Sequence, residues 1–93
     1  MLSNSETQSR SAEPEAIAIR ALAWTLSDDR RAERLLSLTG LTPEQLRGGL
    51  EDRAVQLAVL DFLAAHEADL LAAAGALDLA PERLAAARAE LAR

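Results

Sequence analysis

The chain contains no cysteine and no tyrosine, and its ten basic residues are all arginine, so lysine is absent as well. Without cysteine there can be no disulfide, no thiolate zinc site and no thiol nucleophile. Without lysine there can be no Schiff base with a substrate carbonyl and no lysine that grips phosphate in a P-loop. These absences exclude several large classes of enzyme and favour a function that is not catalytic.

Histidine occurs once, as His66. Helical metal sites of the Glu-x-x-His or His-Glu-x-x-His type need more than one imidazole, and a serine-type triad needs a nucleophile motif that the chain lacks. Asp69 follows three residues later, which leaves open a small enzyme that uses His66 with a neighbouring carboxylate. We interpret His66 as a structural or solvated side chain and expect no catalytic residue, no metal ion and no cofactor.

Basic residues are fewer than acidic ones, 10 against 15, which gives a formal net charge of −5. The imbalance lies in residues 43–93, where five arginines face nine acids, whereas residues 1–42 have five against six. Nucleic acids and membrane surfaces are anionic, so this balance disfavours both as partners.

The polar start of the chain is unlike a signal peptide, and the apolar runs are shorter than the ~20 residues that span a bilayer. We expect a cytoplasmic protein.

Alanine (21) and leucine (18) dominate the composition, whereas valine and isoleucine together number four. Alanine and leucine favour helices, and strands are usually rich in β-branched residues. We therefore predict an all-α protein, a compact orthogonal bundle of five or six short helices. Residues 14–93 should form this single domain, and the serine-rich residues 1–13 should form a disordered tail because they have few apolar groups to bury.

Turn and capping residues divide the first half of the domain. Pro14 suits the first position of a helix that runs to about Leu26, and Ser27 is the expected N-cap of the next. Gly40 should end that second helix in a left-handed conformation. Residues 42–45 then read Thr-Pro-Glu-Gln, a capping box that opens a third helix.

Residues 51–74 form the most apolar part of the chain. Val55, Val59 and Phe62 recur at helical spacing and indicate a central helix. The pattern lapses at residues 66–69, so this segment is either one long helix or two. We favour a break, because a continuous helix would place His66 on the apolar face.

The last part of the domain contains two further helix signals. Gly75 should close the segment before it, and Pro81 should open the final helix.

In the central helix, Asp61 falls opposite the apolar face and should therefore point outward.

Arg30, Arg31 and Arg34 form a basic cluster in which positions three and four apart share a helical face. This cluster is either a small positive patch that binds a partner or a solvated face. In the second interpretation its charge is balanced by Asp28, Asp29 and Glu33.

Trp24 is the sole tryptophan. It shares a stripe with Ile17 and Ala21, which favours the core, but tryptophan is also a frequent anchor of protein interfaces. The sequence leaves both interpretations open.

Residues 35–50 have the outline of a helix-turn-helix, a common DNA-binding motif. The second helix would present Glu44, Gln45 and Arg47 to the bases and then meet two glycines. An acidic half-domain would also face the phosphates, which disfavours this interpretation.

Four segments resemble a small alphaproteobacterial family, domain of unknown function 3572. They are residues 15–23 (Glu-Ala-Ile-Ala-Ile-Arg-Ala-Leu-Ala), 34–41 (Arg-Leu-Leu-Ser-Leu-Thr-Gly-Leu), 59–63 (Val-Leu-Asp-Phe-Leu), and Gly75 leading to Pro81-Glu82. The resemblance covers roughly residues 14–92. It implies a compact helical domain in a bacterial cytoplasm with no established activity, and so no functional residues to carry over.

We therefore expect a non-catalytic protein–protein interaction or regulatory module of the bacterial cytoplasm, not an enzyme. Its Leu/Ala-rich helices can form grooves for a protein partner or for a second copy of the chain. The candidate partner-binding residues are Trp24, Arg30, Arg31 and Arg34. The alternative is a nucleic-acid-binding, helix-turn-helix-like domain that uses the Arg30/Arg31/Arg34 cluster.

Overall fold

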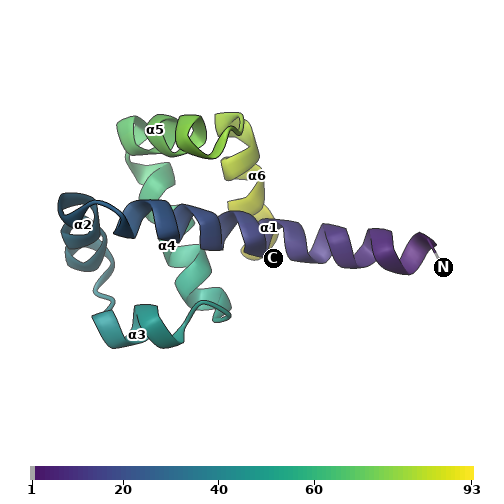
Figure 1. The fold of residues 1–93 in the computed structure, drawn as a ribbon, viewed down its shortest axis with the longest axis horizontal. Coiled ribbons are helices and arrows are strands. Elements are labelled where there is room, and N and C mark those ends of the chain that lie inside the picture. The colour runs from purple at the N-terminus through teal and green to yellow at the C-terminus, as the bar shows by residue number, and fades with distance from the viewer. Residues whose placement is uncertain (1) are drawn as a thin grey trace.

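The computed structural model describes the backbone of residues 2–93 and the side chains of residues 13–93. Over this part of the chain there are six helices and no strand. Figure 1 shows them in order: α1 (Leu2–Leu26), α2 (Asp29–Thr39), α3 (Pro43–Gly48), α4 (Arg53–Ala65), α5 (Glu67–Leu77) and α6 (Pro81–Leu91). The predicted all-α fold of five or six helices is confirmed.

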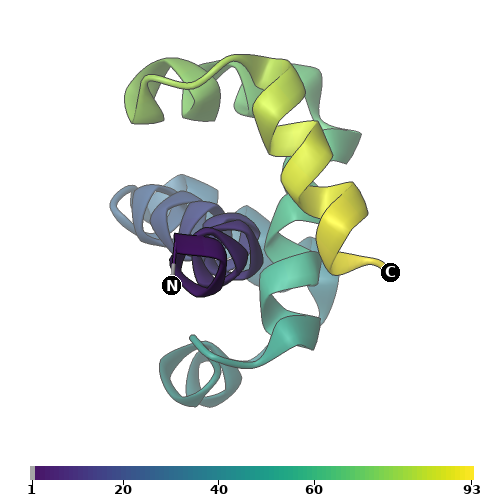
Figure 2. The ribbon, with the colours of Figure 1, turned by 90° about the vertical axis from the view of Figure 1, so that its right-hand side faces the viewer.

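Helices α1 and α4 are the two central elements, since each contacts α2, α5 and α6 and the two also contact each other. Figure 2 views the molecule almost along α1 and shows the chain from α3 to α6 curving around that helix. Within residues 13–26, the buried residues of α1 lie along one broad face of the helix: Pro14, Ile17, Ala18, Ala21, Leu22 and Thr25.

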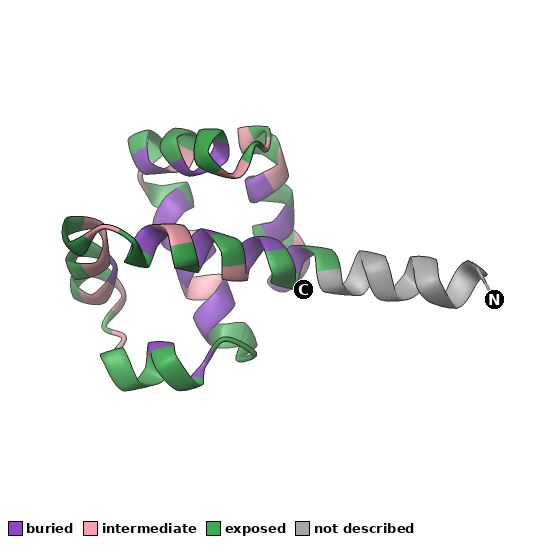
Figure 3. Ribbon diagram, viewed as in Figure 1, coloured by how far each residue is buried: buried purple, intermediate pink, exposed green. Residues whose placement is uncertain are grey.

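The core is built where α1, α4 and α6 meet, and Figure 3 shows their buried faces turned toward one another. Leucine and valine fill this space, with Val59 and Leu63 of α4 fully buried. Ala18 and Ala21 of α1 and Ala87 of α6 are also fully buried. Their small side chains allow neighbouring helices to approach closely at the crossings.

The predicted capping box at the start of α3 is confirmed. The Thr42 hydroxyl accepts a hydrogen bond from the Gln45 backbone N–H at 3.1 Å, and the Gln45 side-chain oxygen accepts one from the Thr42 N–H at 2.8 Å. Pro43 occupies the first turn. The same helix ends at Gly48, where two consecutive glycines disfavour its continuation.

The prediction that Ser27 caps α2 is wrong by one residue. Asp28 is the N-cap, and its carboxylate accepts a hydrogen bond from the Arg31 backbone N–H at 3.1 Å. A carboxylate is also favoured by the positive end of the helix dipole. The Ser27 hydroxyl instead donates to the Trp24 carbonyl at 2.6 Å, because the last carbonyls of α1 have no partner within the helix.

Residues 51–74 form two helices, as we favoured, and not one. His66 is the last flanking residue of α4 and the first of α5, with an extended backbone (φ −130°, ψ 92°) that no α-helix can include. Its N–H donates to the Leu63 carbonyl at 3.1 Å, and its own carbonyl accepts from the Leu70 N–H at 2.9 Å. Both helix ends are therefore joined through a single residue.

The predicted end of the second of these helices is wrong, since Gly75 lies inside α5 and Asp78 ends it. Asp78 takes the left-handed conformation (φ 57°, ψ 47°), which aspartate tolerates better than most residues other than glycine. The Leu79 N–H donates to the Ala74 carbonyl at 2.9 Å and closes the turn. At the other predicted boundaries, Gly40 ends α2 with φ 76° and Pro81 opens α6, as expected.

At the N-terminal end, α1 includes Pro14 within its length, so the predicted start at that proline is not observed. A proline lacks the backbone N–H donor of other residues, and the burial of its ring offsets part of this loss.

The predicted disordered tail of residues 1–13 lies outside the described side chains except for Glu13. The Glu13 carboxylate pairs with Arg83 of α6 at 2.6 Å, and this contact raises the pKa of the Arg83 guanidinium.

Two glycine substitutions should have opposite effects on stability. Gly40→Ala should lower the free energy of unfolding by roughly 1–2 kcal/mol, because alanine is strained at φ 76°. Gly75→Ala should raise it by about 0.5–1 kcal/mol, because Gly75 is helical and a methyl group would meet open space. Urea unfolding followed by circular dichroism measures both. Equal signs for the two variants would contradict the assigned helix ends.

Candidate functional site

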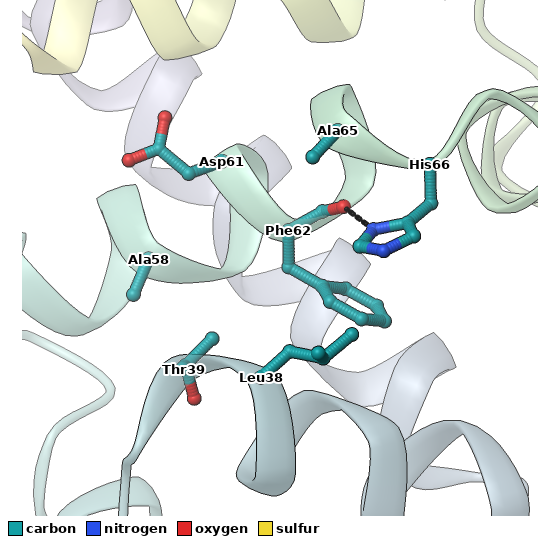
Figure 4. A pocket seen from close by; sticks show the side chains of 7 residues that line it. All are labelled: Leu38, Thr39, Ala58, Asp61, Phe62, Ala65 and His66. Carbon is teal, nitrogen blue, oxygen red and sulfur yellow. Dashed lines mark hydrogen bonds between the residues drawn. The ribbon is translucent and has the colours of Figure 1, made fainter.

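A cleft of about 290 Å³ lies between the last turn of α2 and the C-terminal half of α4. We call it the α2–α4 cleft, and Figure 4 shows the seven residues that line it. They are Leu38 and Thr39 from α2, Ala58, Asp61, Phe62 and Ala65 from α4, and His66 from the junction of α4 and α5.

The walls of the α2–α4 cleft are mainly apolar. Leu38 is 59% exposed, more than any other large hydrophobic residue among residues 13–93. Phe62 is buried against the core, and its ring lies beside the Leu38 side chain in Figure 4. Ala58 and Ala65 lie two helical turns apart on α4, and their methyl groups leave the space open.

His66 has one ring nitrogen engaged and one available. Nδ1 lies 2.7 Å from the Phe62 carbonyl oxygen. Because a carbonyl can only accept, Nδ1 must carry the proton in this hydrogen bond, and Nε2 of the neutral ring is then an acceptor. Figure 4 shows this second nitrogen on the side of the ring that faces Leu38 and Phe62. The Phe62 and His66 ring centroids are 5.0 Å apart, so the imidazole is also held by an aromatic contact.

The other two polar residues of the cleft are already engaged. The Asp61 carboxylate forms an ion pair with Arg88 of α6 and turns away from Phe62, which confirms that it points outward. The Thr39 hydroxyl donates to the Leu35 carbonyl at 2.5 Å and accepts from the Leu41 N–H at 3.3 Å. Among the residues that line the cleft, His66 therefore offers the polar atom best placed to meet a ligand.

The predicted partner-binding residues Trp24 and Arg31 contact each other. The Arg31 guanidinium lies 3.8 Å from the centre of the Trp24 ring, a cation–π geometry. It also donates to the Trp24 carbonyl at 2.8 Å and to the Ser27 hydroxyl at 3.0 Å. Trp24 packs on the core and is partly buried, so arginine covers part of the indole that a partner would otherwise meet.

Arg34 is committed to a contact within the chain. It forms an ion pair with Asp69 of α5, whose side chain is only 13% exposed, and it lies 5.8 Å from the centre of the Phe62 ring. Arg30 is exposed and lines a shallow depression on α2 together with Glu33, Arg34 and Ser37. The three arginines therefore share a helix but do not form one open positive patch.

These contacts weaken the case for the nucleic-acid alternative. Arg31 and Arg34 already satisfy groups of the chain itself, and phosphates would have to compete for them. The second helix of the suspected helix-turn-helix is α3, which has only six residues. Such a helix is too short to lie along a major groove as a recognition helix does.

The sequence did not indicate Leu38, Ala58 or Ala65 as parts of a site. Ala58 and Ala65, seven residues apart on α4, and Leu38 at the end of α2 occupy positions that are also those of ordinary surface residues. One feature of the sequence did point to the site: the apolar pattern lapses at His66, which lies at one end of the cleft.

Among residues 13–93, no three histidine, cysteine or acidic side chains are close enough together to hold a metal ion. None of the helices described combines the length and the apolar character needed to cross a membrane.

Comparison with known proteins places the chain in a family. The model of the family described as "Protein of unknown function (DUF3572)" matches residues 11–93, which confirms the resemblance inferred from the four sequence segments. No curated protein and no solved structure matches the chain.

Removal of Arg34 should test whether its ion pair holds α2 against α5. Arg34→Ala should lower the free energy of unfolding by about 1–3 kcal/mol because Asp69 would lose its charge partner while largely buried. The value should fall toward the lower end because the Arg34 side chain is 46% exposed. Urea unfolding gives the difference. Arg30→Ala is the control and should change stability little, so similar losses for both variants would contradict this role.

Proposed function

We propose that the chain, which belongs to the DUF3572 family, is a non-catalytic protein–protein interaction module that binds a segment of a partner protein in the α2–α4 cleft. The observation that carries this proposal is the exposure of Leu38 at the mouth of an apolar cleft. A leucine at this position adds nothing to the core, and its contact with water is unfavourable.

The size and lining of the cleft support a peptide side chain as its occupant. Small-molecule sites usually enclose about 300–1,000 Å³. The volume of about 290 Å³ lies at the lower limit of that range. It suits one or two side chains of a docked segment better than a whole cofactor. An amphipathic helix that lies in a groove uses apolar anchors of this kind.

The chemistry of the cleft supports binding without catalysis. A general base acts together with a nucleophile or a second titratable group within hydrogen-bond reach. His66 uses Nδ1 for a backbone carbonyl, and Asp61 is paired with Arg88 and turned away. The hydroxyl of Thr39 is engaged with backbone groups on both sides.

Two of the earlier candidates on α2, Arg30 and Arg34, lie on the same side of the helix as Leu38. Arg30, Arg34 and Leu38 follow one another at four-residue spacing, so they lie along one side of α2. A partner helix placed along α2 would insert an apolar side chain beside Leu38 and would pass Arg34 and Arg30. Arg30, which is exposed, could then pair with an acidic residue of the partner.

Site-specific crosslinking in the native host tests the proposal. A photo-reactive phenylalanine analogue at position 38 should give one discrete product with a partner protein, whereas the analogue at position 71 should give none at comparable yield. Leu71 is the matched control because it is 52% exposed but lies on α5, outside the cleft. Addition of Ala58→Arg should abolish the product, since a long side chain there fills the cleft.

The crosslinked products also separate the alternatives. A product that contains a second copy of this chain would show that the cleft binds another copy of the chain and not a different protein. A product formed equally from positions 38 and 71 would contradict the cleft as the binding site. A product at position 38 that survives Ala58→Arg would contradict it as well.

A further inference from the structure

The available nitrogen of His66 gives the α2–α4 cleft a chemical preference. Resting on the proposed function, we infer that the cleft recognises a tryptophan side chain of the partner through a hydrogen bond from the indole N–H to Nε2 of His66. The apolar part of the indole would lie against Leu38 and Phe62.

The first step of the argument is the fixed orientation of the imidazole. Its hydrogen bond to the Phe62 carbonyl at 2.7 Å and its contact with the Phe62 ring hold the ring in place. The same hydrogen bond selects the tautomer, so Nε2 of the neutral ring can only accept. No hydrogen bond to Nε2 is found from the residues whose side chains are described.

The second step is the match between this acceptor and the walls around it. A ligand must place an apolar surface against Leu38, Phe62 and the alanines while presenting a single donor. Indole has this combination, since its N–H donates and the ring has no acceptor. A ligand hydroxyl can also donate to Nε2, but its oxygen is an additional acceptor that Thr39 does not pair, because the Thr39 hydroxyl already donates to the Leu35 carbonyl. Tyrosine is therefore a poorer match than tryptophan.

The third step concerns charge. The Asp61 carboxylate is paired with Arg88, and Arg34 is paired with Asp69. Neither ion pair directs an unpaired charge into the cleft, so an uncharged aromatic donor fits better than a lysine or an arginine.

Two probes that differ in one group test the inference on the full chain. Indole and benzothiophene have almost the same shape, but only indole has an N–H donor. In NMR titrations at about pH 8, both should shift the amide signals of the cleft residues. Indole should bind roughly three- to tenfold more tightly, as expected for one added neutral hydrogen bond. His66→Phe should remove this difference while it retains benzothiophene binding.

Further measurements do not depend on the folding of that variant. A long-range ¹H–¹⁵N spectrum of the wild-type chain should show Nδ1 protonated, and indole should shift the His66 Nε2 signal more than benzothiophene does. Leu38→Ala should weaken both probes together. If the probes shift amide signals on another surface and not those of the cleft residues, the inference is overturned. A proton on Nε2 of His66 in the free chain would overturn it as well.

Equal affinities for the two probes would overturn the role of His66 but leave the apolar cleft as a docking surface. The crosslinking from position 38 decides that broader proposal independently.

Discussion

The interruption of the helix at His66 is the constraint on which the rest of the structure depends. Without it, α4 and α5 would continue in one direction, and α5 could not turn to contact α1 and α6. The turn brings Asp69, in the first turn of α5, to Arg34 of α2, which is 35 residues earlier in the chain. A local change of backbone direction therefore creates the long-range ion pair that ties α2 to the bundle.

The candidate site follows from the same constraint. Because Arg34 and the fully buried Leu35 hold α2, the next turn of that helix presents Leu38 to α4 at a defined place. His66, freed from helical geometry by the break, can turn its ring back onto Phe62 and bind the Phe62 carbonyl. The residue that ends α4 thus also supplies the polar group of the cleft.

Local signals in the sequence predicted the helices well and the site poorly. The capping box at Thr42, the glycine at position 40 and the proline at position 81 act through neighbouring backbone groups, and so they were predicted correctly. Arg34 looked like part of a basic patch, because nothing local shows that Asp69 would reach it from another helix. The end of α5 was misplaced because Gly75 and Asp78 can both take a left-handed turn, and the local sequence does not show which of them does.

The buried alanines of the core have a consequence for how the family can vary. Ala18 and Ala21 of α1 and Ala87 of α6 are 0% exposed, and α1 and α6 contact each other. A cavity can often relax after a side chain is shortened, whereas an added methylene at a close crossing forces whole helices apart. Substitutions to larger apolar residues should therefore be rarer at these positions in related chains than at the leucines around them. The high alanine content is in part a requirement of helix spacing.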